Sequence, residues 1–126
     1  MGLFDPNQDA SDALAGRLAE QYPALELATG SKDPEGYDLV VNATPLGMKD
    51  DDPLPMDVDR IAPTTFVGEV VMKTEITPFV RAARERGCET QIGIDMLYEQ
   101  IPALLKFFGF STTTPEELRG LAQIEY

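Results

Sequence analysis

An unbroken apolar run between Asp38 and Asn42 constrains the fold of this chain more than any other segment. Its leucine and valine residues do not alternate with polar ones, and strands of this type are usually buried on both faces of a parallel sheet. The run leads into the small residues Ala43 and Thr44, and open α/β sheets bind ligands at the carboxyl ends of their strands. We predict either a cofactor-binding lip or an ordinary strand-to-loop exit at this turn.

Segments with strand-like and helix-like patterns alternate along the rest of the chain. Such alternation favours a doubly wound parallel sheet with helices between the strands. We therefore expect an α/β fold, in which a Rossmann-like sheet forms one partial domain over residues 1–126. The expected strands are 3–4, 25–28, 38–42, 65–71 and 89–92, and the expected helices are 9–22, 77–87, 95–108 and one that follows a capping box at 114–117.

The glycine-rich turn that opens a dinucleotide-binding half is missing, because none of the ten glycines forms a G-x-G sequence. The chain is therefore expected to enter the fold at its second strand, without the central first one. Unpaired inner edges would then remain at Leu3-Phe4 and at the strand that ends at Asn42. We expect these edges either to pair directly or to drive self-association, and we favour a homo-oligomer.

The charge balance excludes several classes of partner. Ten Lys and Arg stand against 22 Asp and Glu, a formal net charge of −12, which repels phosphate backbones and anionic headgroups. No segment reaches the roughly 18 consecutive apolar residues of a membrane span. We expect a soluble, cytoplasmic protein that binds neither nucleic acid nor membranes.

The chain contains no histidine, and Cys88 is its only cysteine. This composition removes Ser-His-Asp triads, Cys-His pairs and the usual zinc sites. Cys88 is therefore interpreted as an inert, half-buried thiol. The run Asp50-Asp51-Asp52 lacks the spaced ligands of a calcium loop and is interpreted as a solvated turn, so no metal site is predicted. We expect Phe107, Phe108 and Phe110 to be core and packing residues.

Three blocks of residues resemble motifs of a known family. Val40 to Met48 is similar to an Asn-Ala-Thr-x-x-Gly-Met block, and Glu69 to Pro78 to an Asp-x-x-Tyr-x-Pro-x-x-Thr-Pro block. Gly93 to Gln100 resembles a Gly-x-x-Met-Leu-x-x-Gln block and is the most specific of the three. Together they resemble the C-terminal, nicotinamide-cofactor domain of the shikimate dehydrogenase family, which includes quinate/shikimate dehydrogenases of aromatic amino acid biosynthesis.

The resemblance implies a role for each matching position. Asn42, Ala43 and Thr44 would line the cofactor side of a cleft, and Val70 would offer its backbone near the nicotinamide. Gly93 would lie against the ring. The substrate-binding positions would be Gln100, which would hydrogen-bond a substrate hydroxyl, and Met72. The alternatives are a buried strand residue for Val70, a turn glycine for Gly93 and a solvated helix face for Gln100.

The chain departs from the family pattern at several positions. Met72 stands where the family has a tyrosine that contacts substrate, Thr74 replaces a proline, and Glu69 replaces an aspartate. A thioether cannot donate a phenol's hydrogen bond, so a less polar or differently shaped hydroxy acid is conceivable. The family's proton-transfer lysine and aspartate lie in an N-terminal domain that has no counterpart here. We assign no catalytic residue, and neither Lys73 nor Asp95 is given that role.

Asp5 bears on cofactor choice. NADP-using relatives have Asn-Arg-Thr at the end of this strand, whereas the corresponding run here is Asp5-Pro6-Asn7. A carboxylate there accepts hydrogen bonds from ribose hydroxyls and repels a 2′-phosphate, which favours NAD over NADP. The alternative is that Asp5 only caps a turn before the helix.

The combined interpretation is a cofactor-binding domain of a shikimate dehydrogenase-like oxidoreductase. The full enzyme would transfer hydride between NAD(P) and shikimate, 3-dehydroshikimate or a related hydroxy acid. This chain alone is expected to be inactive, and the fragment is not certain to bind cofactor. The alternative is a non-catalytic α/β interaction or scaffold module, which the missing glycine loop and proton-transfer lysine support.

Overall fold

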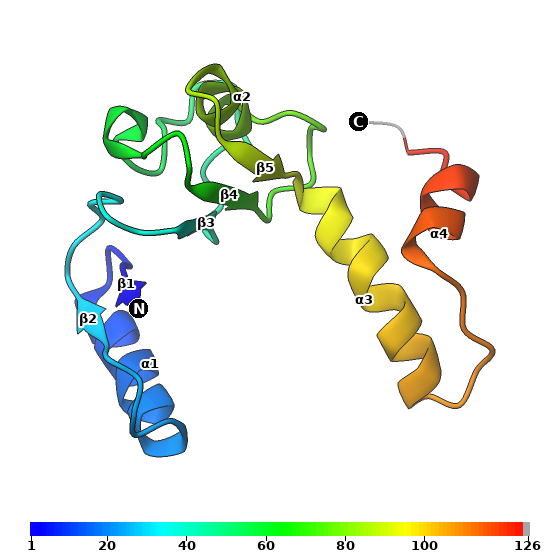
Figure 1. Cartoon of the computed structure of the whole chain (residues 1–126), viewed down its shortest axis with the longest axis horizontal. Coiled ribbons are helices and arrows are strands. Elements are labelled where there is room, and N and C mark those ends of the chain that lie inside the picture. Colours follow the sequence, from blue (N-terminus) through cyan, green and yellow to red (C-terminus); the bar gives the residue numbers. More distant parts are fainter. Residues whose placement is uncertain (125–126) are drawn as a thin grey trace. The chain divides into compact units, whose positions relative to one another are not determined.

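The computed structural model describes residues 1–124 and divides the chain into two compact units. The first unit is Met1–Asp33 and the second begins at Pro34. Figure 1 shows the first unit in blue to cyan and the second from cyan to red. Each unit contains parallel strands and at least one helix, so the predicted α/β class is confirmed.

The first unit is a small strand-helix-strand element. β1 (Gly2–Leu3) pairs in parallel with β2 (Ala28–Thr29), and α1 (Gln8–Gln21) connects them. The Thr29 hydroxyl donates to the Asp12 carboxylate of α1 at 2.6 Å, and this bond, with a second from Gln8, lowers the pKa of Asp12. α1 is largely exposed: Ser11 is its buried residue, and Leu14 is 38% exposed.

The second unit is built on a three-stranded parallel sheet with the order β3-β4-β5 (Figure 1). Its strands begin within three residues of the expected starts, since each apolar run is bounded by turn residues. Because β3 is the first strand in this order, it is an edge strand of the sheet. Asn42 at its end lies opposite Glu69 at the end of β4. The elements are β3 (Leu39–Asn42), the short 3-10 helix η1 (Val58–Arg60), β4 (Phe66–Glu69), α2 (Pro78–Glu85), β5 (Glu89–Gln91), α3 (Gly93–Phe107) and α4 (Pro115–Leu121).

A hydrophobic core lies between α2 and one face of this sheet. Phe79 and Ala83 of α2 are 1% and 0% exposed, and they pack with Val40 and Val67, which are neighbours across β3 and β4. The buried residues of this core are Val40, Val58, Ile61, Val67, Phe79, Ala83 and Cys88. Cys88 is therefore more deeply buried than expected, with its thiol 3.5 Å from the Ala62 carbonyl.

The other face of β3 is not buried, so the prediction of a strand covered on both faces is wrong for this structure. Leu39 is 58% exposed and Val41 is 47% exposed, whereas Val40 and Asn42 between them are buried. The reason is that α2 covers the Val40 side, and β3 has β4 as its only sheet neighbour among residues 1–124. An apolar run alone does not reveal how many layers will cover it.

Local sequence signals placed the helix ends well. Thr77 caps α2 by accepting a hydrogen bond from the Val80 N–H at 3.2 Å, and the chain leaves this helix through Gly87 at a φ of +89°. The capping box of α4 is confirmed between Thr114 and Glu117. α3 begins two residues earlier than predicted, at Gly93.

The prediction for the aromatic residues that follow α3 is wrong. Phe107, Phe108 and Phe110 are 80%, 66% and 67% exposed, because the end of α3 lies beyond the α2-covered core. The rings of Phe107 and Phe108 contact each other edge to face at 5.1 Å. Among residues 1–124, every helix is too short or too polar to cross a bilayer.

Candidate functional site

The carboxyl ends of β3 and β4 meet at one edge of the sheet, and each ends in a buried polar residue. Asn42 is 1% exposed and Glu69 is 2% exposed. Their side chains bond directly, because the Asn42 amide nitrogen donates to both Glu69 carboxylate oxygens at 3.0 and 3.2 Å. The first two sequence blocks are therefore joined by a buried hydrogen-bonded pair.

Glu69 also gathers donors from the segment that follows β4. Its Oε1 accepts the backbone N–H groups of Val70 at 2.8 Å and Val71 at 3.0 Å. Its Oε2 accepts the Thr77 hydroxyl at 2.9 Å, and Thr77 in turn caps α2. Burying a carboxylate is costly unless donors surround it, and four donor groups do so here.

The turn after β3 is held by the other end of the Asn42 amide. Asn42 Oδ1 accepts both the Thr44 N–H at 3.1 Å and the Thr44 hydroxyl at 2.7 Å. Thr44 Oγ1 accepts the Leu46 N–H, and Asn42 Nδ2 donates to the Leu46 carbonyl at 3.0 Å. Every polar atom of the Asn42 amide is thus occupied within the turn. The Asn42 side chain therefore shapes the turn after β3 and does not project into solvent.

The neighbouring predicted cofactor residues present other surfaces. Ala43 is exposed, and Thr44 and Val70 are half-buried. Lys49 and Gly47 donate their backbone N–H groups to the Asp52 carboxylate at 2.9 and 3.0 Å, which lowers the pKa of Asp52 and folds the aspartate run into a turn. Among residues 1–124, no three His, Cys, Asp or Glu side chains are grouped for a metal ion.

Gly93 packs directly on the segment that leaves β4. A β-carbon at this position would lie 2.1 Å from the Val71 carbonyl oxygen and 3.1 Å from Met72 Cγ. Gly93 therefore serves close contact between the start of α3 and the β4 exit, a role beyond that of a turn glycine. Met72 itself is 46% exposed beside this contact.

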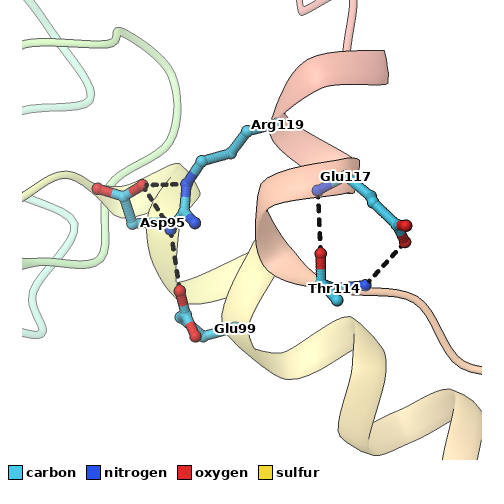
Figure 2. A network of polar contacts seen from close by, with 5 residues as sticks. All are labelled: Asp95, Glu99, Thr114, Glu117 and Arg119. Atoms are coloured by element: carbon cyan, nitrogen blue, oxygen red, sulfur yellow. Dashed lines mark hydrogen bonds and ion pairs between the residues drawn. The ribbon is translucent and has the colours of Figure 1, made fainter.

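Gln100, the second predicted substrate residue, lies exposed on α3. Earlier on the same helix, Asp95 and Glu99 bind Arg119 of α4 at 3.1 and 3.0 Å (Figure 2). The Arg119 guanidinium also lies 5.4 Å from the centre of the Tyr98 ring. The carboxylates, with Glu99 first, raise the pKa of Arg119. Asp95 therefore takes part in a link between helices.

A hollow of about 540 Å³ lies over the uncovered face of the sheet and reaches the end of β4. Its wall is mostly apolar, with Glu69 and Val70 at the strand end and Met96 contributed by α3. Met96 lies inside the third block, but no role was predicted for it. The lining residues are Leu39, Val41, Phe66, Gly68, Glu69, Val70, Gln91 and Met96.

The residues of the second unit suit the ring end of a nicotinamide cofactor better than its diphosphate. An apolar hollow beside ordered strand ends can receive a flat ring with a few polar contacts. No buried side-chain polar atom among residues 1–124 lacks a hydrogen-bond partner. The chain also has no G-x-G turn to bind a diphosphate.

Asp5 belongs to the first unit. Its Oδ1 accepts the Asn7 N–H at 2.8 Å, which forms a turn immediately before α1. This contact is the turn-capping alternative of the sequence analysis. The carboxylate's other oxygen has no hydrogen bond among residues 1–124, so selection of NAD by Asp5 stays a prediction.

The structural roles of Glu69 and Thr77 were not predicted. In the motif comparison Glu69 is only a replacement for aspartate, although a lone carboxylate at the end of an apolar strand indicates a buried partner. The threonine of Thr77-Pro78 was interpreted as a helix start, which is correct. Its hydroxyl also reaches back to β4, which no local pattern indicates.

Comparisons with curated proteins find shikimate dehydrogenases. The chain is 40% identical over 82 residues to shikimate dehydrogenase (NADP(+)) of Jannaschia sp., covering 64% of this chain and 30% of that protein. It is 34% identical over 123 residues to the enzyme of the same name from Rhodospirillum rubrum, covering 94% of this chain and 44% of the relative. No protein-family model matches the chain.

Solved structures show the same relationship. Quinate dehydrogenase from Corynebacterium glutamicum in complex with NAD superposes with a TM-score of 0.79 at 28% identity. That match covers 94% of this chain and 44% of the solved chain. The chain therefore spans less than half the length of the relatives that it matches.

Proposed function

We propose that this chain, which matches a C-terminal fragment of the shikimate dehydrogenase family, binds the nicotinamide end of NAD or NADP in an oxidoreductase of that kind. The observation that carries the proposal is the buried bond between Asn42 and Glu69, which orders both strand ends beside an apolar hollow. Strand ends of parallel sheets are the usual ligand sites of such folds.

The chain's own residues would orient the ring and exclude water. Ala43 and Thr44 at one strand end and Val70 at the other would form the polar side of the site, with Gly93 close behind Val70. Met96 and the sheet face would supply the apolar side. The bound cofactor supplies the hydride, and the protein supplies position and electrostatics.

The substrate belongs to the same proposal. Met72 and Gln100 are exposed, as residues that face a second domain's substrate must be before it docks. Gln100 would donate or accept a hydrogen bond at a hydroxyl of a shikimate-type acid, and the Met72 thioether would contact an apolar edge. The family resemblance is the support for a role in aromatic amino acid biosynthesis and for a cytoplasmic location.

The choice between NAD and NADP has support in both directions. The curated relatives are named for NADP(+), whereas the quinate dehydrogenase was solved with NAD. Asp5 would favour NAD through charge repulsion of a 2′-phosphate. The relatives' names argue against that preference, so the proposal covers both cofactors.

The chain by itself is proposed to be catalytically inactive. It has no residue assigned as a counterpart of the family's proton-transfer lysine and aspartate, and catalytic groups act as a unit, so their loss removes most of the rate enhancement. The alternative function is a non-catalytic interaction module with the same fold. The absent G-x-G turn favours that alternative, since diphosphate binding normally depends on it.

Amide chemical shifts measured with nicotinamide mononucleotide, NAD⁺ and NADP⁺ test the proposal. The expected result is saturable shifts at Ala43, Thr44, Val70 and Gly93 with all three ligands. Ala43→Glu should weaken them by blocking the exposed lip. Ala62→Glu adds the same charge at an exposed site elsewhere in the unit and should leave them unchanged. Shifts that are absent, or that both variants weaken equally, would favour the interaction module.

A further inference from the structure

We propose that Glu69 is a positioning residue that sets the backbone of the cofactor lip, defined here as Asn42–Thr44 together with Val70–Val71. The identity of the ligand in this inference rests on the proposed function, whereas the role of Glu69 in the geometry does not. Glu69 is 2% exposed and lies under the lip, so it acts through other residues. Its carboxylate is where three segments that are distant in sequence meet, namely the β3 exit, the β4 exit and the start of α2.

The first step concerns the β4 exit. Both Val70 and Val71 donate their N–H groups to the same oxygen, Oε1, at 2.8 and 3.0 Å. The Val70 N–H also donates to the Asn42 backbone carbonyl at 3.2 Å. The backbone therefore curls around the carboxylate of the residue that ends the strand. This curl also brings the Val71 carbonyl against Gly93, so the start of α3 is seated by the same contact.

The second step concerns the orientation of the Asn42 amide. Its nitrogen donates to Glu69 and to the Leu46 carbonyl, and its oxygen accepts the two Thr44 donors. A flipped amide would place its oxygen against the carboxylate and its nitrogen against the Thr44 N–H. Glu69 thereby selects one orientation of Asn42, and that orientation sets the Thr44 turn.

The third step shows why a carboxylate is needed. Both oxygens face the Asn42 nitrogen, and the remaining neighbours Val70, Val71 and Thr77 also donate. A glutamine at this position has one acceptor oxygen, and either orientation of its amide sets an NH₂ group against the Asn42 NH₂ group. A shorter aspartate would lose reach by one methylene.

The exchange of a donor for an acceptor provides a sharp test. In Glu69→Gln, hydrogen-exchange protection of the Thr44 and Val71 amides should fall by about tenfold or more. Val70 should lose less protection, because its N–H keeps the bond to the Asn42 backbone carbonyl. Protection of Val67 in the strand interior should change less. Asn42→Asp combined with Glu69→Gln restores an acceptor opposite the new NH₂ group. It also sets an oxygen against the Leu46 carbonyl, so it should recover only part of the lost protection. Glu89→Gln removes the same charge from an exposed site on β5 and should change none of these amides.

The dissociation constant of the cofactor is the second measurement, and a role of Glu69 in fold stability alone would not change it. With NADP⁺ or NAD⁺ as the probe, the dissociation constant of Glu69→Gln should rise by about tenfold, and the double variant should fall between it and the unaltered chain. If the unaltered chain binds neither probe, the proposed function fails while the exchange data still decide the positioning role.

Two results would overturn the inference. One is unchanged protection of the lip amides in Glu69→Gln, and the other is an equal loss over the lip and the α2 core. If Glu69→Gln does not fold, the double variant decides: a folded double variant with protected lip amides supports the pairing, and an unfolded one contradicts it.

Discussion

The Val71 carbonyl oxygen stands 2.1 Å from the point where a β-carbon on Gly93 would lie, so these two residues are in backbone-to-backbone contact. The two residues are distant in the sequence, and their contact joins the β4 exit to the first turn of α3. Because the obstructing atom is backbone, a side chain at Gly93 cannot be accommodated by a change of rotamer.

Gly93→Ala is expected to destabilise the second unit by about 3 kcal/mol, since the methyl group must push α3 away from the β4 exit. Urea unfolding followed by circular dichroism measures the loss. Gly120→Ala in α4 is the matched control, because nothing lies within 4 Å of its added carbon. That control should change the free energy of unfolding by less than about 1 kcal/mol. Equal effects of the two substitutions would refute the contact.

Thr77→Ala is expected to cost about 1–2 kcal/mol in the free energy of unfolding, because it removes the cap of α2. Thr77 is 0% exposed and also donates to Glu69, so the loss leaves a buried carboxylate short of a donor. Thr77→Ser keeps the hydroxyl and should remain much closer to the unaltered chain. A serine variant as unstable as the alanine variant would indicate that packing of the methyl group dominates.

The α4 capping box is expected to open at acidic pH. Hydrogen bonds from the Thr113 hydroxyl and the Thr114 N–H lower the pKa of the Glu117 carboxylate from its ordinary value of 4.5. A carboxylate with a depressed folded pKa stabilises the fold above its unfolded pKa and loses that contribution as the pH falls through the folded value. Residues 115–121 should therefore keep their helical carbon chemical shifts above pH 4.5 and lose them progressively below it.

Glu117→Gln preserves the hydrogen-bonding side chain of a capping box and should remove this acid-dependent step. Glu116→Gln, the neighbouring carboxylate in the same turn, should leave the step in place. Because Asp12 and Asp52 also have lowered pKa values, the measurement must be local to α4 and not a global melting curve. A step that persists in Glu117→Gln would assign it to another group.

Self-association is expected through the uncovered side of β3. Leu39 and Val41 expose 58% and 47% of their surfaces on an edge strand, a combination that favours pairing with another chain. Light scattering over a range of concentrations should show a mass above that of the monomer. Val41→Lys should lower it, whereas Leu54→Lys, at a 40% exposed loop position, should not. A monomer mass at high micromolar concentration in the unaltered chain would contradict the homo-oligomer.

The sequence determined the features whose causes lie within a few residues of one another. Thr114 and Glu117 form their capping box across a single turn, and Thr77-Pro78 begins α2 as its pattern predicts. Strands followed from short apolar runs between turn residues, and the parallel α/β class followed from their alternation with helices. Propensity, capping and periodicity act over this short range, so a single sequence is enough to predict the features that they cause.

Tertiary structure alone decided which surfaces are covered and what the polar residues bind. Val40 and Val41 are the same residue type in one run, yet α2 buries the first and leaves the second open. Glu69 receives its donors from Asn42, 27 positions away, and from Thr77, eight positions away. Burial and hydrogen-bond satisfaction depend on partners that folding brings together from distant parts of the chain, and no local pattern specifies them.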